Sequence, residues 1–554
     1  MANASLTSTP SSTGRAGRWR KRHAEESEIS ALPKVNDGNK SVCIVGAGIA
    51  ALVAAKHLQR HGFCVRLFGY CGKNEDGSGD KLGGRLYTEH WDLQSHKMQG
   101  PWKVASGTCN EASTIRFDVG CQLFTATDPT FCAEISEWQQ AGVVKAWESV
   151  RVGCVTATGS CSLLHPEDLP VVFCADGGMT QIIEHLTREI GPETVVYHIA
   201  QRVVKGNHKR YAIEYEEVLT ASSYLDFVGG NLPQKTASKR WSEEFDYIVL
   251  AHGLAVNQPR MVSFENDAAQ NIIECLKRNV RFQNILTLTL AFRTRLSIPA
   301  DVFVTEGCQE IALVVHTSAK PGLKNVDGYD VWTAFSSPEF ARKFALPKRK
   351  GEALSLMKEA FLSYFHLEGI RRKLVSPDGT PFGLLWPHGR CTTCPAGDFR
   401  ALFHAVAGVA CCGDCFAGAP GLQGTIVSAV QAAEAIAFHD KGLTAPPNLL
   451  IDLEIPWRPI PHAIPWVIAH FPGLPPPLSC TVPDAPCAVS QYCCPTHDWL
   501  GCHPGLVFGR SAALGPKGKG KTYSHSDDTG GKAASTSKGK RPAFRSAGKS
   551  ASKA

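Results

Sequence analysis

The chain has 554 residues, with 58 Lys and Arg against 51 Asp and Glu, which gives a formal net charge of +7 at pH 7. From Gly509 onward 11 Lys and Arg face two Asp, so the basic excess belongs to the C-terminal tail, and we expect no nucleic-acid partner for the core. No apolar run reaches the roughly 18 residues of a membrane span. The 21 Cys do not form the framework of a small disulfide-rich secreted domain, so we expect an intracellular protein. The length of the chain suits two or three domains.

Residues 1–40 are predicted to be disordered. The first 22 contain no acidic residue, many Ser, Thr and Ala, and four Arg, which is typical of an organellar transit peptide. A disordered start without a targeting role is the alternative. The expected location is therefore a plastid or mitochondrion, and otherwise the cytoplasm.

The segment Ser41–Ala51 has the pattern of a buried strand that runs into a glycine turn and a helix, and Val65–Phe68 is predicted to be the next strand. Such a βαβ unit holds a dinucleotide pyrophosphate at the N-terminus of its helix. Gly46 makes the tight turn, Gly48 lets the phosphates approach the backbone, and Ala51 allows close helix–strand packing. The candidate cofactor-binding residues of this turn are Gly46, Ala47, Gly48, Ile49, Ala50 and Ala51.

The end of the second predicted strand departs from the usual pattern. An acidic residue normally stands there and binds the hydroxyls of the adenosine ribose. Gly69 occupies this place, followed by Tyr70. Glu75 or Asp76 in the next loop could replace the missing carboxylate, or the contact is absent and cofactor affinity is weakened.

The middle of the chain changes from helix-containing to strand-like patterns. Residues 206–244 form a polar insertion, predicted to be a surface loop, and Phe245–Gly253 is an apolar run typical of a parallel strand buried on both faces. Apolar residues alternate with Thr and Ala over Leu286–Phe292, which predicts a half-buried strand. Residues 312–315 and 330–333 are its expected companions in a mainly antiparallel sheet.

Helical spacing of apolar residues within 354–361 predicts a helix that covers this sheet. A strand over 408–412 and a helix over 425–438 follow. Residues 443–510 form a Pro- and Cys-rich extension, and residues 511–554 form a basic, low-complexity tail that we expect to be disordered.

Several separated blocks resemble one family of flavoproteins. Gly83-Gly84-Arg85 resembles the GGR segment that follows the Rossmann unit in amine-oxidase-type flavoproteins, and Phe117–Thr125 resembles the D-x-G-A-Q-Y-F-T segment of the renalase-like branch. Ala175–Met179 is similar to the G-x-P-G-M loop of these proteins, and Gly413-Asp414 to their C-terminal G-D signature. The order and spacing of these blocks, spread over residues 41–440, indicate a renalase-like, flavin amine-oxidase-like oxidoreductase.

The resemblance implies an α/β fold with FAD as the cofactor. It implies a Rossmann-type FAD-binding domain built from residues 41–116, 173–262 and 395–442. A second domain with a mixed or antiparallel sheet, residues 117–172 and 263–394, is expected to bind the substrate.

The resemblance also assigns roles to single residues. Arg85 would neutralise the pyrophosphate, Asp414 would accept hydrogen bonds from ribityl hydroxyls, and the helix N-terminus near Thr425 would stabilise negative charge on the flavin. In this family a valine on a later strand contacts adenine through its backbone, which points to Val203. The further cofactor-binding candidates are Gly83, Gly84, Gly413, Gly424 and Ile426.

For the reaction, the motif positions place Gln122, Phe124 and Trp386 at the flavin as candidate catalytic residues. The expected reaction is hydride transfer from a small reduced substrate, an amine or a dihydronicotinamide, to flavin, with O₂ as the acceptor and H₂O₂ as product. Relatives carry H-R-W before the last strand where this chain has Leu384–His388, so the substrate does not transfer from the family. The alternatives are a dehydrogenase or desaturase of the same fold with another acceptor, and a degenerate nucleotide-binding protein without catalysis.

Two cysteine patterns carry weaker predictions. Cys391 and Cys394 form a CxxC motif without a thioredoxin-like context, so ordinary thiols are the preferred interpretation. The Cys and His residues between 480 and 503 have no regular zinc-site spacing, and no metal is expected. The oligomeric state is left open.

Overall fold

The computed structural model places all described residues in the first of two compact units, Met1–Cys502, and the second unit is His503–Ala554. The predictions for residues 1–38 and 460–554 lie outside the described part of the chain. The described residues are 39–69, 82–94, 97–99, 113–196, 198–217, 240–251, 263–265, 267–323, 326–344, 349–375, 382–416, 421–446, 448–450 and 453–459.

The first large sheet has seven strands, and its first five in spatial order are parallel. The sixth runs antiparallel to the fifth. Most side chains of these strands are buried, which agrees with the nearly continuous apolar runs of the sequence. In spatial order the strands are β11 (Val195–Val196), β2 (Cys64–Phe68), β1 (Ser41–Val45), β15 (Tyr247–Leu250), β25 (Val409–Cys411), β24 (Ala401–His404) and β26 (Leu449–Leu450).

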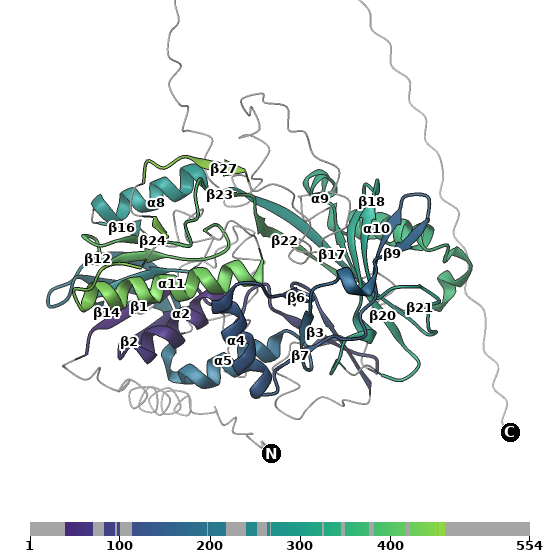
Figure 1. Cartoon of the computed structure of the whole chain (residues 1–554), viewed down its shortest axis with the longest axis horizontal. Coiled ribbons are helices and arrows are strands. Elements are labelled where there is room, and N and C mark those ends of the chain that lie inside the picture. Colours follow the sequence, from purple (N-terminus) through teal and green to yellow (C-terminus); the bar gives the residue numbers. More distant parts are fainter. Residues whose placement is uncertain are drawn as a thin grey trace, which may run out of the picture. The chain divides into compact units, whose positions relative to one another are not determined.

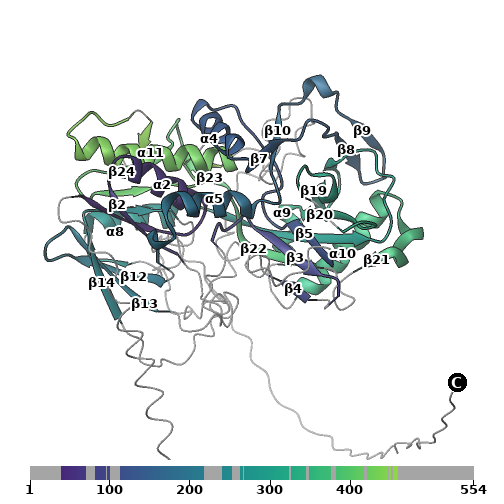
Figure 2. The same cartoon turned by 90° about the horizontal axis from the view of Figure 1, so that it is seen from below.

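Four helices share one core with a face of this sheet (Figures 1 and 2). They are α2 (Ile49–Arg60), α4 (Pro129–Gln140), α5 (Thr180–Ile190) and α11 (Leu422–Asp440). Helices α2 and α11 pack directly on the strands of the sheet, α5 packs on α2, and α4 packs on α11. Helix α2 ends where Gly62 adopts a φ of 88° and donates its N–H to the Gln59 carbonyl oxygen (2.9 Å), as expected. Helix α4 begins because the Asp128 carboxylate accepts the Thr130 N–H at 2.8 Å.

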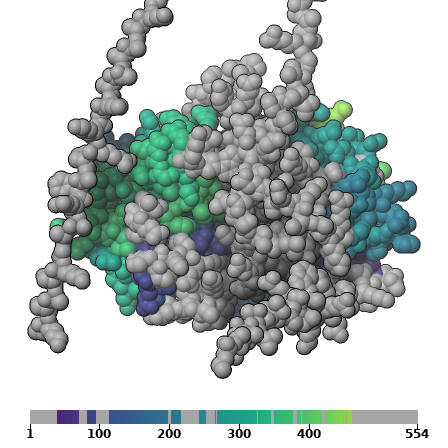
Figure 3. Space-filling model, turned by 180° about the vertical axis from the view of Figure 1, so that it is seen from behind, coloured from purple at the N-terminus to yellow at the C-terminus, as the bar shows by residue number. Residues whose placement is uncertain are grey.

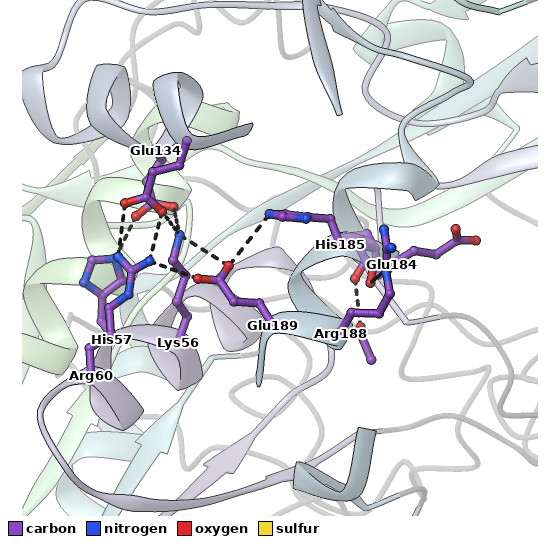
Figure 4. A network of polar contacts seen from close by, with 11 residues as sticks. Lys56, His57, Arg60, Glu134, Glu184, His185, Arg188 and Glu189 are labelled. Carbon is purple, nitrogen blue, oxygen red and sulfur yellow. Dashed lines mark hydrogen bonds and ion pairs between the residues drawn. The ribbon is translucent and has the colours of Figure 1, made fainter. Parts of the chain in front are cut away.

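A network of ion pairs joins three of these helices (Figure 4). The Lys56 side chain on α2 is 1% exposed, and its ammonium lies 2.9 Å from Glu134 and 2.6 Å from Glu137, both on α4. Glu189 on α5 is 3.6 Å from the same ammonium. The helix layer is therefore held together by charge as well as by apolar packing.

The other face of the sheet is covered by a smaller sheet and helix α8 (Asp267–Asn279), which share one apolar core with it. The expectation of a surface loop over residues 206–244 is wrong for 211–217 and 240–244, which pair as strands because Tyr211, Ile213 and Tyr215 alternate toward the core. Residues 218–239 lie outside the described part. The strands are β14 (Arg240–Phe245), β13 (Tyr211–Glu217), β12 (His198–Lys205) and β16 (Ser263–Phe264).

The second large sheet has eight strands and is mainly antiparallel, as predicted. Its long strand β17 (Phe282–Phe292) buries Leu286, Leu288 and Leu290 against the predicted helix, which is α10 (Lys350–Tyr364). Helix α9 (Pro338–Lys343) packs beside β17. The other strands are β21 (Leu374–Val375), β20 (Asp330–Ser336), β19 (Ile311–His316), β18 (Val302–Glu306), β8 (Val152–Thr156), β9 (Cys161–Leu163) and β22 (Phe382–Cys391), which pairs with β17.

Three small sheets complete the described structure. One of them packs on the second large sheet through Trp91 and Phe117, so Trp91, from the segment 41–116 predicted for the FAD-binding domain, shares a core with strands of the predicted substrate domain. The small sheets are β4-β3-β5 (Lys97–Gln99, Thr88–Asp92, Thr114–Asp118), β6-β10-β7 (Phe124–Thr125, Val172–Ala175, Val144–Ala146) and β23-β27 (Thr393–Pro395, Trp457–Pro459). Figure 3 shows the molecule from behind, with residues of the second large sheet and its helices in teal to green. In the described part of the chain, no helix has the length and hydropathy required to span a membrane.

Candidate active site

The glycine turn after β1 leaves the N-terminus of α2 open. Gly46 has a φ of 135° and donates its N–H to the Phe68 carbonyl oxygen at 2.9 Å. Gly48 is the N-cap residue of α2, no side chain caps it, and the first turn carries no acidic residue. A Cβ atom on Gly48 would have nothing within 4 Å. The free N–H groups of this helix end therefore face open space that an anion can fill.

The Gly83-Gly84-Arg85 loop lies directly on this turn. The Gly83 N–H donates to the Ala47 carbonyl oxygen at 2.7 Å, and Gly83 and Gly48 form an isolated parallel bridge. Gly83 and Gly84 have φ values of 98° and 58°, a region that favours glycine. A Cβ on Gly83 would lie 2.5 Å from the Ile183 side chain, so this glycine is required by packing as well.

Arg85 connects the loop to the second predicted cofactor segment. Its Nη1 donates to the Asp414 carboxylate at 2.8 Å and to the Gly389 carbonyl oxygen at 3.0 Å. Burial lowers the pKa of Arg85, but the charge of Asp414 and its hydrogen bond outweigh burial and raise the pKa overall. The side chain of Asp414 is 10% exposed and that of Arg85 is 28% exposed. The two candidates are therefore partners of each other, and each stays open on one side to a ligand.

Helix α11 supplies a second open helix N-terminus. Its N-cap is Gly421 with a φ of 134°, a residue without a side chain that could cap the helix, and no acid lies in the first turn. Gly424, Thr425 and Ile426 lie in the first turns, and the Thr425 hydroxyl donates to the Gly421 carbonyl oxygen at 2.8 Å. The Gly413 N–H donates to the Ser428 hydroxyl of this helix at 2.9 Å, which fixes the Asp414 loop beside it.

The glycine turn and the Gly413–Asp414 loop lie at the edge of the sheet where α/β proteins bind ligands. The chain runs from β1 to β2 and β11 on one side and continues with β15 and β25 on the other, so the strand order reverses between β1 and β15. Ligands bind outside the carboxyl ends of the strands at such a switch point. The glycine turn follows β1 and the Gly413–Asp414 loop follows β25. These groups fit a long dinucleotide. The N-terminus of α2 and the space at Gly48 suit its phosphates, and the Asp414 carboxylate suits its hydroxyl groups.

The three candidate catalytic residues lie in different environments. Gln122 is fully buried, and its amide is held by the Lys320 ammonium (2.6 Å) and the Asp118 carbonyl oxygen (2.6 Å). Phe124 is buried between Phe131 and Phe173 in the core under the helices.

Trp386 on β22 is only partly buried, and its indole N–H donates to the Val119 carbonyl oxygen at 3.0 Å. Of the three side chains, Trp386 thus retains an accessible surface, whereas Gln122 and Phe124 are taken up by internal contacts. Their contact with flavin stays a prediction.

The predicted adenine and ribose contacts stay predictions. Val203 lies in β12 between β13 and β16, and its carbonyl oxygen accepts the Glu265 N–H at 3.1 Å. Gly69 follows β2 and donates its N–H to the Val196 carbonyl oxygen at 3.2 Å. The possible substitutes Glu75 and Asp76 lie outside the described residues.

The sequence interpretation missed three charged residues beside the site. Arg390 on β22 is 1% exposed, and burial lowers its pKa to about 10, although the nearby Asp414 carboxylate counteracts this shift. Asp118 and Lys320 form an ion pair at 2.9 Å. The Asp118 carboxylate was present in the D-x-G segment that the resemblance used, but the sequence holds no local signal for Lys320 as its partner.

The two cysteines of the CxxC motif, Cys391 and Cys394, are buried free thiols. Burial raises the pKa of Cys394, which makes it a poor nucleophile. Among the described residues no group of three or more His, Cys, Asp and Glu could hold a metal, and residues 480–503 are not among them.

Residues 44–131 match the model of the NAD(P)-binding Rossmann-like domain. This part of the chain has a Rossmann-like fold. The match takes in the glycine turn, helix α2 and the Gly83–Arg85 loop, which belong to the site described above. No curated protein sequence gives a significant match.

Solved structures with a similar chain trace include an oxidoreductase from Methanosarcina mazei (12% identity, TM-score 0.43, covering 70% of this chain and 98% of that one). A putrescine oxidase bound to putrescine is 12% identical with a TM-score of 0.47, covering 73% and 99% of the two chains. A cyclohexylamine oxidase from Brevibacterium oxydans is 12% identical with a TM-score of 0.45, covering 73% and 100%.

Proposed function

We propose that the chain is an FAD-dependent oxidoreductase of the renalase-like, amine-oxidase-like type. The observation that carries the proposal is the pairing of Arg85 with Asp414 beside two uncapped helix N-termini, those of α2 and α11. One helix end suits the pyrophosphate and the other suits negative charge on a reduced flavin.

Each group of the chain has a distinct task in this proposal. The N-terminus of α2 binds the pyrophosphate, and Gly48 and Gly84 leave room for it. Asp414 accepts hydroxyl hydrogen bonds from the ribityl chain while Arg85 holds its carboxylate in place. Bound FAD would supply the electron-accepting chemistry, and the protein would supply orientation and electrostatics.

The proposed substrate is a small reduced molecule, an amine or a dihydronicotinamide. An amine would lose a hydride and a proton and leave as an imine. A dihydronicotinamide would lose a hydride alone, and the second proton would come from water. In both cases O₂ would accept two electrons and two protons and leave as H₂O₂. Trp386 borders the proposed substrate side, because its ring is partly exposed and its indole N–H is fixed on Val119. If Trp386→Phe leaves the rates of flavin reduction unchanged, Trp386 has no part in catalysis.

The first test is the colour of the purified full-length protein. We expect the visible absorbance of oxidised flavin, and release of FAD rather than FMN on denaturation, identified by chromatography. A colourless protein that cannot be reconstituted with FAD would refute the proposal and favour a non-catalytic nucleotide-binding protein.

The second test identifies the acceptor. Amines and dihydronicotinamide isomers are offered in air, and H₂O₂ is measured. The same reactions are repeated without O₂ and with an artificial dye as acceptor. H₂O₂ formation supports an oxidase, whereas turnover with the dye alone supports the rival dehydrogenase.

A further inference from the structure

A buried ion pair lies beside the site and has no part in the cofactor contacts proposed above. Lys320 follows the short 3-10 helix Thr317–Ala319, and its ammonium lies 2.9 Å from the Asp118 carboxylate. The two side chains are 1% and 2% exposed. The ammonium also donates to the Gln122 side-chain carbonyl oxygen at 2.6 Å.

Asp118 is the junction of several separate segments. Its Oδ1 accepts the Thr88 hydroxyl at 2.7 Å and the Met179 N–H at 2.8 Å, and its Oδ2 accepts from Lys320. Thr88 begins β3 and Met179 precedes α5. Both carboxylate oxygens are therefore engaged, and the ion pair has a fixed position.

Gln122 connects the ion pair to the backbone of the short segment Val119–Gln122 through hydrogen bonds. Its side-chain amide donates to the backbone carbonyl oxygens of Asp118 (2.6 Å) and Gly120 (3.2 Å), which closes the segment into a compact turn. With Lys320 on the amide oxygen, the Gln122 side chain has a single orientation.

The segment touches both sides of the proposed cofactor site. The Cys121 N–H donates to the Arg85 carbonyl oxygen at 2.8 Å, and a Cβ on Gly120 would lie only 1.9 Å from that same oxygen. On its other side, the Val119 carbonyl oxygen accepts the Trp386 indole N–H at 3.0 Å. A shift of the segment would therefore move the backbone that carries Arg85 and the ring of Trp386 together.

The charges of Lys320 and Arg85 also act on this segment, at the side chain of Cys121. Burial raises the pKa of the Cys121 thiol to about 12, and the charges of Lys320 and Arg85 both lower it from a still higher value. The two cations therefore act on one side chain, which lies in the segment between them.

Stability alone does not account for such a pair. Replacing a buried ion pair by apolar residues of similar volume is often neutral or stabilising, so a pair of this kind is better explained by the geometry it fixes. We propose that Lys320 is a positioning residue of the flavin site, which holds the Val119–Gln122 turn, and through it Arg85 and Trp386, in the geometry that the reaction needs. This inference rests on the proposed function.

The test compares two variants that remove a similar buried ammonium. Lys320→Met removes the cation at the turn, and Lys56→Met removes a cation that is 1% exposed and paired with the 4% exposed Glu134 in the helix layer. Both variants remove the lysine partner of a buried carboxylate and should lower the melting temperature. Only Lys320→Met should also shift the flavin absorption band and lower the rate of flavin reduction, by about tenfold to a hundredfold for a displacement near 1 Å. Lys320→Arg should recover part of that rate.

A measurement without flavin separates this inference from the proposed function. Hydrogen exchange in the apoprotein should show faster exchange of the Cys121 N–H in Lys320→Met and unchanged exchange in Lys56→Met. A wild-type protein that binds no FAD refutes the proposed function, and the exchange result then decides whether Lys320 holds the turn. Equal exchange at Cys121 in both variants, or flavin spectra and reduction rates that match the wild type in Lys320→Met, would overturn the inference.

Discussion

Gly48→Ser is expected to separate cofactor binding from folding. Gly48 has a φ of −82° and a ψ of 177°, which any residue adopts, and an added Cβ would meet nothing within 4 Å. Serine is a preferred N-cap residue, because its hydroxyl accepts an N–H from the first turn of the helix. The substitution therefore suits the apoprotein and takes up both the space and the N–H donors that the pyrophosphate would use.

The size of the effect follows from these contacts. Serine and glycine differ by only a few tenths of a kcal/mol at an N-cap, so the melting temperature of the apoprotein should stay the same or rise slightly. A hydrogen bond to a charged group contributes about 1.5–3 kcal/mol. Loss of one such bond to the pyrophosphate raises the dissociation constant of FAD by about 10- to 150-fold.

The assay is titration of the apoprotein with FAD, followed by flavin fluorescence, with thermal unfolding in parallel. Gly351→Ser on the exposed start of α10 is the matched control, since its added Cβ also meets nothing within 4 Å. We expect wild-type affinity for this control. Unchanged FAD affinity in Gly48→Ser would refute the assignment of the α2 N-terminus to the pyrophosphate.

Three further predictions concern buried charges and thiols. Lys56→Met leaves Glu134 buried without its main cation and should reduce the free energy of unfolding by about 3–5 kcal/mol in denaturant titrations. The pKa of His316 is raised by its bonds to two Asp side chains despite burial, so its contribution to stability is complete below its unfolded pKa of about 6.5 and is lost as pH rises through the folded value. Thermal unfolding against pH should show this loss in the wild type and not in His316→Gln. Iodoacetamide should modify the exposed Cys132 in the native protein but not Cys412, whose pKa burial raises to about 12.

Each of these three predictions has a control or an outcome that would contradict it. Arg60→Met removes an exposed member of the helix-layer network, with a side chain 46% exposed, and should cost less than about 1 kcal/mol. An equal loss in Arg60→Met and Lys56→Met would contradict the role of burial. For His316, a melting temperature that falls in parallel with pH in both proteins would show that other groups titrate. Early modification of Cys412, detected by peptide mass spectrometry, would show that the buried segment after β25 opens in the native state.

The local elements could be predicted because their signals lie within a few residues. The alternation around Leu288 and the helical spacing around Met357 each bury one face, and the structure confirms the strand β17 and the helix α10. The prediction of a surface loop over 206–244 was wrong for part of that segment. Its polar average concealed the strands β13 and β14. Tyr211 and Tyr215 on β13 are buried in a core shared with strands of the first large sheet, which no local pattern could show.

The sequence by itself determined the glycine turn at Gly46 and Gly48, because positive φ and close approach demand glycine at those places. It also determined the order of motifs that brings FAD into consideration. The tertiary structure alone decided which side chains meet. Arg85 lies 329 positions from Asp414 and Lys320 lies 202 positions from Asp118, yet both pairs stand within 3 Å. A buried charge needs an opposite charge nearby but sets no spacing along the chain, so only the folded backbone selects its partner.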